Sequence, residues 1–108
     1  MDSKLASPQA DLLCEALTTL KSREEAYRLL EDLCTYQEVH AMAQRLEVAR
    51  MLRSGATYQE VVTKTGASTA TISRVNRCLL YGTEGYRTIL DRLDKQEGQD
   101  DGSERSES

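Results

Sequence analysis

The residues best suited to chemistry form a run of small hydroxyl side chains and two arginines between Ser68 and Arg77, directly after Gly66 and Ala67. Hydroxyls donate and accept hydrogen bonds, threonine methyl groups can contact the methyl group of thymine, and arginine binds phosphate or guanine. A helix that carries such residues on one face is typical of segments that enter the major groove of DNA. The run therefore indicates nucleic-acid recognition.

Helical spacing divides this run into two faces. Ile72 and Val75 are three residues apart, so they share one side of a helix and, with Ala67, are expected to anchor it. The opposite face is expected to contact DNA, with Thr71 at its edge: Ser68, Thr69, Ala70, Ser73, Arg74 and Arg77. The alternative is a solvated helical hairpin, but Ser and Thr are mediocre helix formers and bring such a helix no stability.

Two short helices must position these residues. The first is predicted over 58–65, with Val61 and Val62 facing inward, and the recognition helix over 68–81. Gly66 supplies the turn between them, as a helix-turn-helix requires. Thr57 and Gln59, at the start of the first helix, are expected to meet the DNA backbone, where the helix dipole also favours phosphate.

Four further helices are predicted around this pair, and no strand. Apolar residues recur at helical spacing over 9–20. Three Ser/Thr-x-x-Glu capping boxes, beginning at Ser22, Thr35 and Thr57, open later helices. The helix after Thr35 should run to about Ser54, and a last short one from Thr83 to about 94. The inward residues of the helix after Thr35 are expected to be Val39, Met42, Ala43, Leu46, Ala49 and Leu52. The fold class is all-α with six helices.

Charge is unevenly distributed along the 108 residues, although the net charge is −4. The span 45–77 has six basic and two acidic residues, so it carries +4 where DNA contacts are expected. The span 1–36 and the tail 95–108 carry −3 each. We expect a flexible N-terminus (1–8), one helical DNA-binding domain (9–94) and a disordered acidic tail (95–108).

Several other functions are disfavoured by what the sequence lacks. Cys14, Cys34 and Cys78 lie far apart without metal-ligand spacing, and His40 is the single histidine, so no metal, cofactor or disulfide framework is expected. There is no catalytic constellation, apolar signal core or membrane span, so a cytoplasmic protein that is not an enzyme is predicted. The five tyrosines are expected to pack through their rings and keep the hydroxyl in water. Tyr58 lies beside the predicted DNA-facing helix start.

Between residues 32 and 81 the stretches QRLEVARML, TYQEV and ASTATISR resemble the Trp repressor superfamily. The resemblance is greatest to its TrpR-related YerC/YecD branch and extends more weakly over 9–94. It implies a small helical DNA-binding protein that forms an intertwined homodimer, and a bacterial transcriptional regulator. Two recognition helices would then contact successive major grooves of a near-palindromic operator in double-stranded DNA.

The resemblance carries the Trp repressor pocket over only in part. Arg45 and Arg74 match the arginines that flank the indole, and Thr35 matches a threonine near the ligand backbone. Val75 stands where the Trp repressor has glycine, and its side chain would occupy space that the indole needs. A vestigial pocket is therefore expected, with tryptophan not its effector. Arg45 and Arg74 would instead contact phosphate and form an internal ion pair or cap.

The leading hypothesis is a sequence-specific regulator, most simply a repressor, and two alternatives remain open. One is a protein-interaction module that keeps the helix-turn-helix only as a fold and docks a partner through its acidic N-terminal half. The other is a redox-responsive regulator that uses Cys34 or Cys78. The operator, the regulated genes and any effector are not encoded in a readable pattern.

Overall fold

The protein is all-α, as the sequence predicts. A computed structural model describes residues 3–100, and the side chains of residues 3–97. Six helices and no strand occur in this range: α1 (Pro8–Thr18), α2 (Arg23–Leu33), α3 (Tyr36–Arg53), α4 (Tyr58–Thr65), α5 (Thr69–Tyr81) and α6 (Gly85–Asp100). The chain divides into two compact units, Met1–Val39 and His40–Ser108. No helix of the described part is long and apolar enough to cross a membrane.

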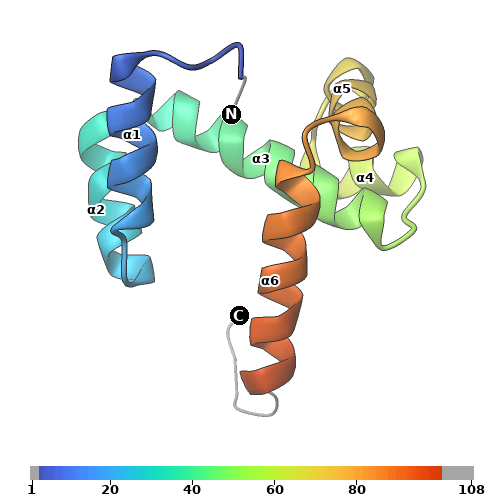
Figure 1. The fold of residues 1–108 in the computed structure, drawn as a ribbon. Coiled ribbons are helices and arrows are strands. Elements are labelled where there is room, and N and C mark those ends of the chain that lie inside the picture. Colours follow the sequence, from blue (N-terminus) through green and yellow to red (C-terminus); the bar gives the residue numbers. More distant parts are fainter. Residues whose placement is uncertain (1–2, 101–108) are drawn as a thin grey trace. The chain divides into compact units, whose positions relative to one another are not determined.

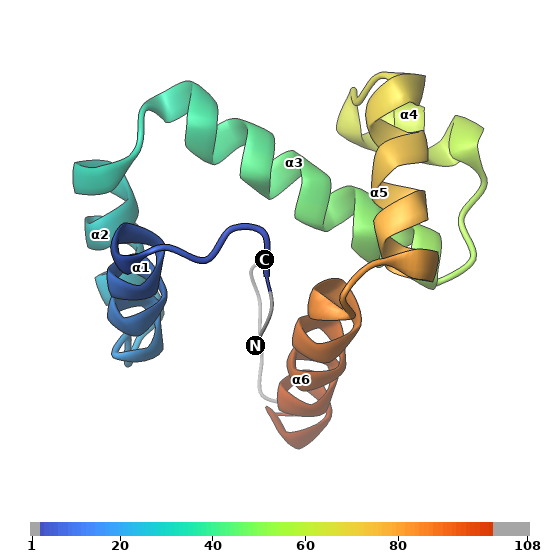
Figure 2. The ribbon, with the colours of Figure 1, turned by 45° about the horizontal axis from the view of Figure 1, so that its top comes forward.

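The first unit holds α1 and α2, which lie side by side as a helical hairpin (Figures 1 and 2). Ser7 caps α1 by accepting a hydrogen bond from the Ala10 amide, and Pro8 occupies the first turn, where it costs no hydrogen bond. Ser22 caps α2 in the same way, but the Glu25 carboxylate accepts from the Lys21 amide (2.9 Å) and not from Ser22. The capping box expected at Ser22 therefore differs in one bond, because its glutamate binds the amide one residue before the cap.

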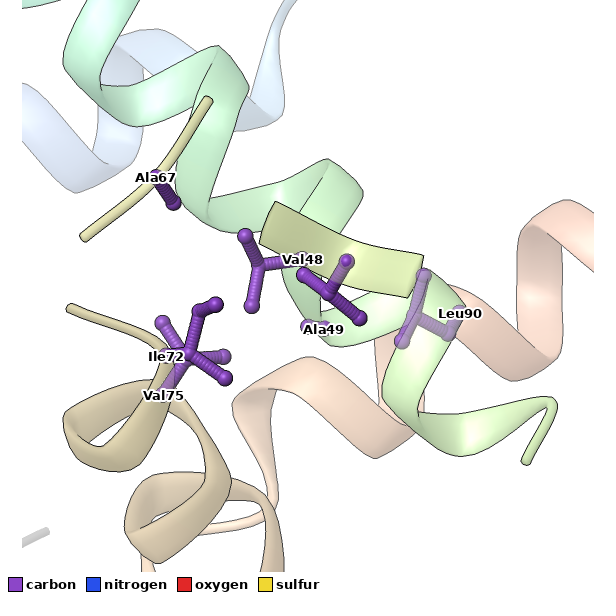
Figure 3. Packing of buried hydrophobic residues seen from close by; sticks show 7 residues of the cluster. Val48, Ala49, Ala67, Ile72, Val75 and Leu90 are labelled. Atoms are coloured by element: carbon purple, nitrogen blue, oxygen red, sulfur yellow. The ribbon is translucent and has the colours of Figure 1, made fainter. Parts of the chain in front are cut away.

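The second unit holds the hydrophobic core. Its residues come from the C-terminal half of α3, from α4, α5 and α6, and from the turn before α5; the buried side chains are Val48, Ala49, Val61, Ala67, Ile72, Val75, Leu79 and Leu90. Figure 3 shows how side chains of this cluster gather between the helices. Each large one contributes about 1.5–3 kcal/mol when buried, so this small cluster fixes how the four helices pack.

The buried face of α3 differs from the predicted one. Ala49 is buried and Leu52 half-buried, but Met42, Ala43 and Leu46 are exposed, and Val39 is only half-buried. Val48, which was not predicted to face inward, is fully buried. Apolar side chains occupy more than one side of α3, so spacing alone did not show which of them are buried within the chain.

The last helix is longer than expected and begins later. The Thr88 amide donates to the Glu84 carbonyl (3.0 Å), so Glu84 and not Thr83 precedes the first helical turn. α6 continues to Asp100, and disorder from residue 95 is wrong for 95–100. Lysine, glutamine and glutamate are good helix formers even without an apolar face. Residues 101–108, like 1–2, lie outside the described residues. At the other end of the chain, the N-terminal segment expected over 1–8 ends one residue earlier, because α1 begins at Pro8.

The tyrosines do not all pack as predicted. Tyr86 is half-buried against the core, whereas Tyr36 and Tyr81 are each 82% exposed. Tyr27 is also exposed, and Tyr58 is exposed beside the start of α4. His40 is exposed on α3.

Candidate nucleic-acid interface

The segment α4–turn–α5 is held by local hydrogen bonds at each helix end. Thr57 Oγ1 accepts from the Glu60 amide (3.1 Å), and Glu60 Oε1 accepts from the Thr57 amide (2.8 Å), which completes the predicted capping box. Gly66 ends α4 with φ of +74°, a left-handed conformation that glycine adopts without a steric penalty. Ser68 Oγ caps α5 by accepting from the Thr71 amide (3.1 Å). α4 has its predicted bounds, and α5 spans 69–81, with Ser68, the first residue of the predicted segment 68–81, as its cap.

The two faces of α5 separate as helical spacing predicts. Ile72 and Val75 are almost completely buried, and Ala67 in the turn is 3% exposed. These residues pack with Val48 and Val61 in one cluster (Figure 3). On the other side the predicted DNA-facing residues are all exposed, with Thr71 half-buried at the edge: Ser68, Thr69, Ala70, Ser73, Arg74 and Arg77.

Only some of the polar side chains predicted to face DNA keep all of their hydrogen-bonding groups free for a ligand. Thr69, Ser73 and Gln59 make no side-chain hydrogen bond within residues 3–97, so their full hydrogen-bonding capacity is open. Ser68 Oγ donates to Thr71 Oγ1 (3.1 Å), which ties these two hydroxyls to each other. Capping therefore uses part of the Ser68 and Thr71 capacity.

The basic side chains fall into two groups. In the described chain, Arg74 and Arg77 are exposed on α5 without an ion pair, and Lys64 at the end of α4 is likewise unpaired. Arg53 contacts the carboxylates of Asp91 (2.6 Å) and Asp94 (3.0 Å) on α6.

Arg50 contacts Glu47 (3.0 Å) and, more distantly, Glu97 (3.9 Å). The +4 of residues 45–77 therefore overstates the positive charge open to phosphate, because α6 carboxylates offset that of Arg50 and Arg53. Within this span, the unpaired positive charge lies on α5, at the end of α4 and on the half-buried Arg45 of α3.

The residues matched to the Trp repressor pocket have different local roles. Thr35 belongs to the first unit, where its hydroxyl and amide form a capping box with Glu38 (3.1 and 2.8 Å). Val75 is 1% exposed and fills the core. Arg45 is half-buried, and neither it nor Arg74 makes an ion pair or capping bond among residues 3–97, so the expected internal partner is absent.

The sequence did not predict one contact of this segment. Gln44 of α3 donates from Nε2 to the Thr65 carbonyl at the end of α4 (3.1 Å), across 21 residues of sequence. No local pattern marks a glutamine as the partner of a distant main-chain carbonyl. The residue lies one position before Arg45, in the motif that carries the family resemblance.

The comparisons with known proteins agree with this geometry. The family model described as Trp repressor protein matches residues 8–94, and the chain belongs to this family. The family is one of regulators and not of enzymes, and it indicates a DNA-binding regulator.

Among its relatives, the uncharacterized protein YerC of Bacillus subtilis (strain 168) is 54% identical over 94 residues, covering 87% of this chain and 90% of YerC.

Two solved structures share the fold. A crystal structure of a candidate Trp repressor from Staphylococcus aureus has a TM-score of 0.80 at 47% identity, covering 84% of this chain and 91% of that one. A TrpR-like protein from Eubacterium eligens has a TM-score of 0.81 at 48% identity, covering 86% of this chain and 96% of that one. The Trp repressor-like fold predicted from the sequence is confirmed.

Proposed function

We propose that this protein is a sequence-specific transcriptional regulator, acting as a repressor, that reads double-stranded DNA with the helix-turn-helix recognition segment 68–81. The observation that carries the proposal is the two-sided character of α5. Its apolar side is buried in the core, and its outer side exposes hydroxyls and two unpaired arginines among the described residues. Small side chains near its N-terminal end allow close approach to base edges.

Each predicted site residue takes a specific part in this proposal. Thr69, Ala70 and Ser73 are placed to contact bases, and Arg74 and Arg77 to bind guanine or phosphate. The Thr57 hydroxyl uses its oxygen as a cap and keeps its proton to donate to phosphate, beside Gln59. Ser68 and Thr71 contribute mainly by holding the N-terminal end of α5.

We further propose that the working form is a homodimer, and that the first unit supplies much of its interface. Among the described residues, α1 and α2 bury no side chain within the chain, yet they carry apolar residues in regular stripes. Leu12 is 72% exposed and Leu33 is 52% exposed. Such stripes are stable in water when a partner covers them. A two-fold dimer would place two α5 helices about 34 Å apart, on successive major grooves.

Tryptophan is not the effector in this proposal. The Val75 side chain, which is almost fully buried, occupies the position where the Trp repressor has glycine. Arg45 then serves a DNA phosphate and Arg74 a phosphate or guanine, and neither contacts an indole. A regulator of bacterial DNA works in the cytoplasm, the location that the sequence predicts.

The decisive experiment selects binding sites from randomised duplex DNA with the purified protein. We expect enrichment of a near-palindrome with half-sites one helical turn apart, and a log-linear loss of affinity with salt. A protein that enriches no sequence and binds DNA weakly at every salt concentration would instead be a protein-interaction module with this fold.

Sedimentation of the same protein tests the dimer. The expected mass is about twice the 12.1 kDa of one chain. A monomer at tens of micromolar would remove the dimer from the proposal without affecting the assignment of α5.

A further inference from the structure

The turn before α5 is a compact hydrogen-bonded structure. Thr65 Oγ1 donates to the Val61 carbonyl (2.8 Å) and accepts from the Ala67 amide (3.1 Å). The Gly66 amide donates to the Val62 carbonyl (2.9 Å). The turn therefore has its own internal bonds, but these tie it only to α4.

Gln44 ties this turn to the scaffold. Its Nε2 donates to the Thr65 carbonyl (3.1 Å), which is one of the last carbonyls of α4 and lacks a partner within that helix. The bond is partly buried, and it joins α3 to a point three residues before Ser68. Partial burial makes such a bond stronger than one exposed to water, because the dielectric there is lower.

We infer that Gln44 is a positioning residue for DNA reading: it fixes the turn, and with it the N-terminal end of α5, where Thr69 and Ala70 are proposed to meet base edges. This inference rests on the proposed function. The middle of α5 is held separately by the burial of Ile72 and Val75. Loss of the Gln44 bond should therefore leave the fold intact and loosen only the end of the helix that carries the small side chains.

The consequence for DNA is a loss of discrimination greater than the loss of overall affinity. Arg74 and Arg77 lie one and two turns along α5 from its N-terminal end, on the part of the helix that the core holds. Their attraction to phosphate does not depend on sequence. Base contacts, in contrast, require hydrogen-bond geometry and are weakened by small displacements.

The test compares Gln44→Met with Gln37→Met. Methionine has nearly the length of glutamine but donates no hydrogen bond. Gln37 is an exposed glutamine on the same helix that makes no side-chain hydrogen bond among residues 3–97, so it is the matched control. Both variants should keep the helical content of the parent; Gln37→Met should also keep its melting temperature, and Gln44→Met should lower it by roughly 4–8 °C for each kcal/mol that the lost bond contributed.

The first readout is amide hydrogen exchange, measured by NMR without DNA. In Gln44→Met the amides of Gly66 and Ala67 should exchange roughly 2- to 12-fold faster, the range that corresponds to one hydrogen bond. The Gln37→Met protein should match the parent. Unchanged protection at Gly66 and Ala67 would overturn the inference, whatever the protein does with DNA.

The second readout is the ratio of affinities for the selected site and for a scrambled duplex. In Gln44→Met this ratio should fall by roughly 2- to 12-fold, while affinity for the scrambled duplex stays the same. An equal loss on both duplexes would overturn the positioning role. If the parent protein shows no preference at all, the proposed function fails and discrimination fails with it, whereas the exchange measurement still decides whether Gln44 holds the turn.

Discussion

Replacing Arg74 and Arg53 by alanine, one at a time, should separate DNA binding from folding. The two variants lose the same charge, and both arginines lie within the basic span of the sequence. In the structure, however, Arg74 has no ion pair among the described residues, whereas Arg53 contacts two carboxylates of α6. The same substitution should therefore produce two different defects.

The magnitudes follow from these contacts. Arg74→Ala removes no intramolecular bond within residues 3–97, so the free energy of unfolding should change by less than about 0.5 kcal/mol. If Arg74 contacts a base, its loss should weaken DNA binding by about 1–3 kcal/mol, or roughly 5- to 150-fold. If it contacts a phosphate, the slope of log affinity against log salt should become less steep by about 0.9.

Arg53 gives the opposite result. Its guanidinium also donates to the Arg87 carbonyl (3.4 Å), and its side chain is 31% exposed. Because the carboxylates of Asp91 and Asp94 are themselves largely exposed, each pair contributes at most about 1 kcal/mol. Arg53→Ala should lower the melting temperature by roughly 4–8 °C for each kcal/mol lost, with DNA affinity unchanged below the transition.

Circular dichroism melts and fluorescence anisotropy with the selected duplex, at two salt concentrations, measure both effects. The two variants should be compared at one protein concentration, since a dimer melts at a temperature that depends on concentration. The division of basic residues into two groups is refuted if Arg53→Ala reduces DNA affinity as much as Arg74→Ala does, or if Arg74→Ala destabilises the fold.

Three further predictions concern the turn, the pocket and the cysteines. Gly66→Ala should destabilise the protein by about 1 kcal/mol in chemical denaturation, because φ is +74° although a Cβ there meets nothing within 4 Å; a more stable variant would contradict the left-handed turn. Calorimetry with sub-millimolar L-tryptophan should show no binding, and a clear isotherm would overturn our account of Val75. Cys34→Ser and Cys78→Ser, alone and together, should leave DNA affinity unchanged before and after oxidant treatment; an oxidant response in the parent that the serine variants lack would favour the redox-responsive alternative.

The helix-turn-helix segment was predictable because its signals are local. Thr57 and Ser68 cap helices through bonds to amides three residues away, and Gly66 marks the turn by its left-handed backbone. Ile72 and Val75 share a face through simple helical spacing. For these reasons the sequence predicts both the bounds of α4 and α5 and the sides they expose.

What the sequence did not predict depends on contacts between distant residues. Arg53 meets Asp94 across 41 residues, and no local pattern pairs them. The same is true of Gln44 and Thr65. The apolar residues of α3 surround much of the helix, so only its packing against the other helices shows that Val48 is buried.

The distribution of buried side chains supports our proposal that this protein reads DNA and does not sense tryptophan. Every fully buried side chain among the described residues lies between Val48 and Leu90, so the second unit alone holds α5. Val75 belongs to that core and packs the inner side of α5 against it. A larger side chain there strengthens the packing of α5 and, in our proposal, fills the space of a ligand. In that proposal the core alone holds the DNA-facing side of α5 in place, without a bound small molecule.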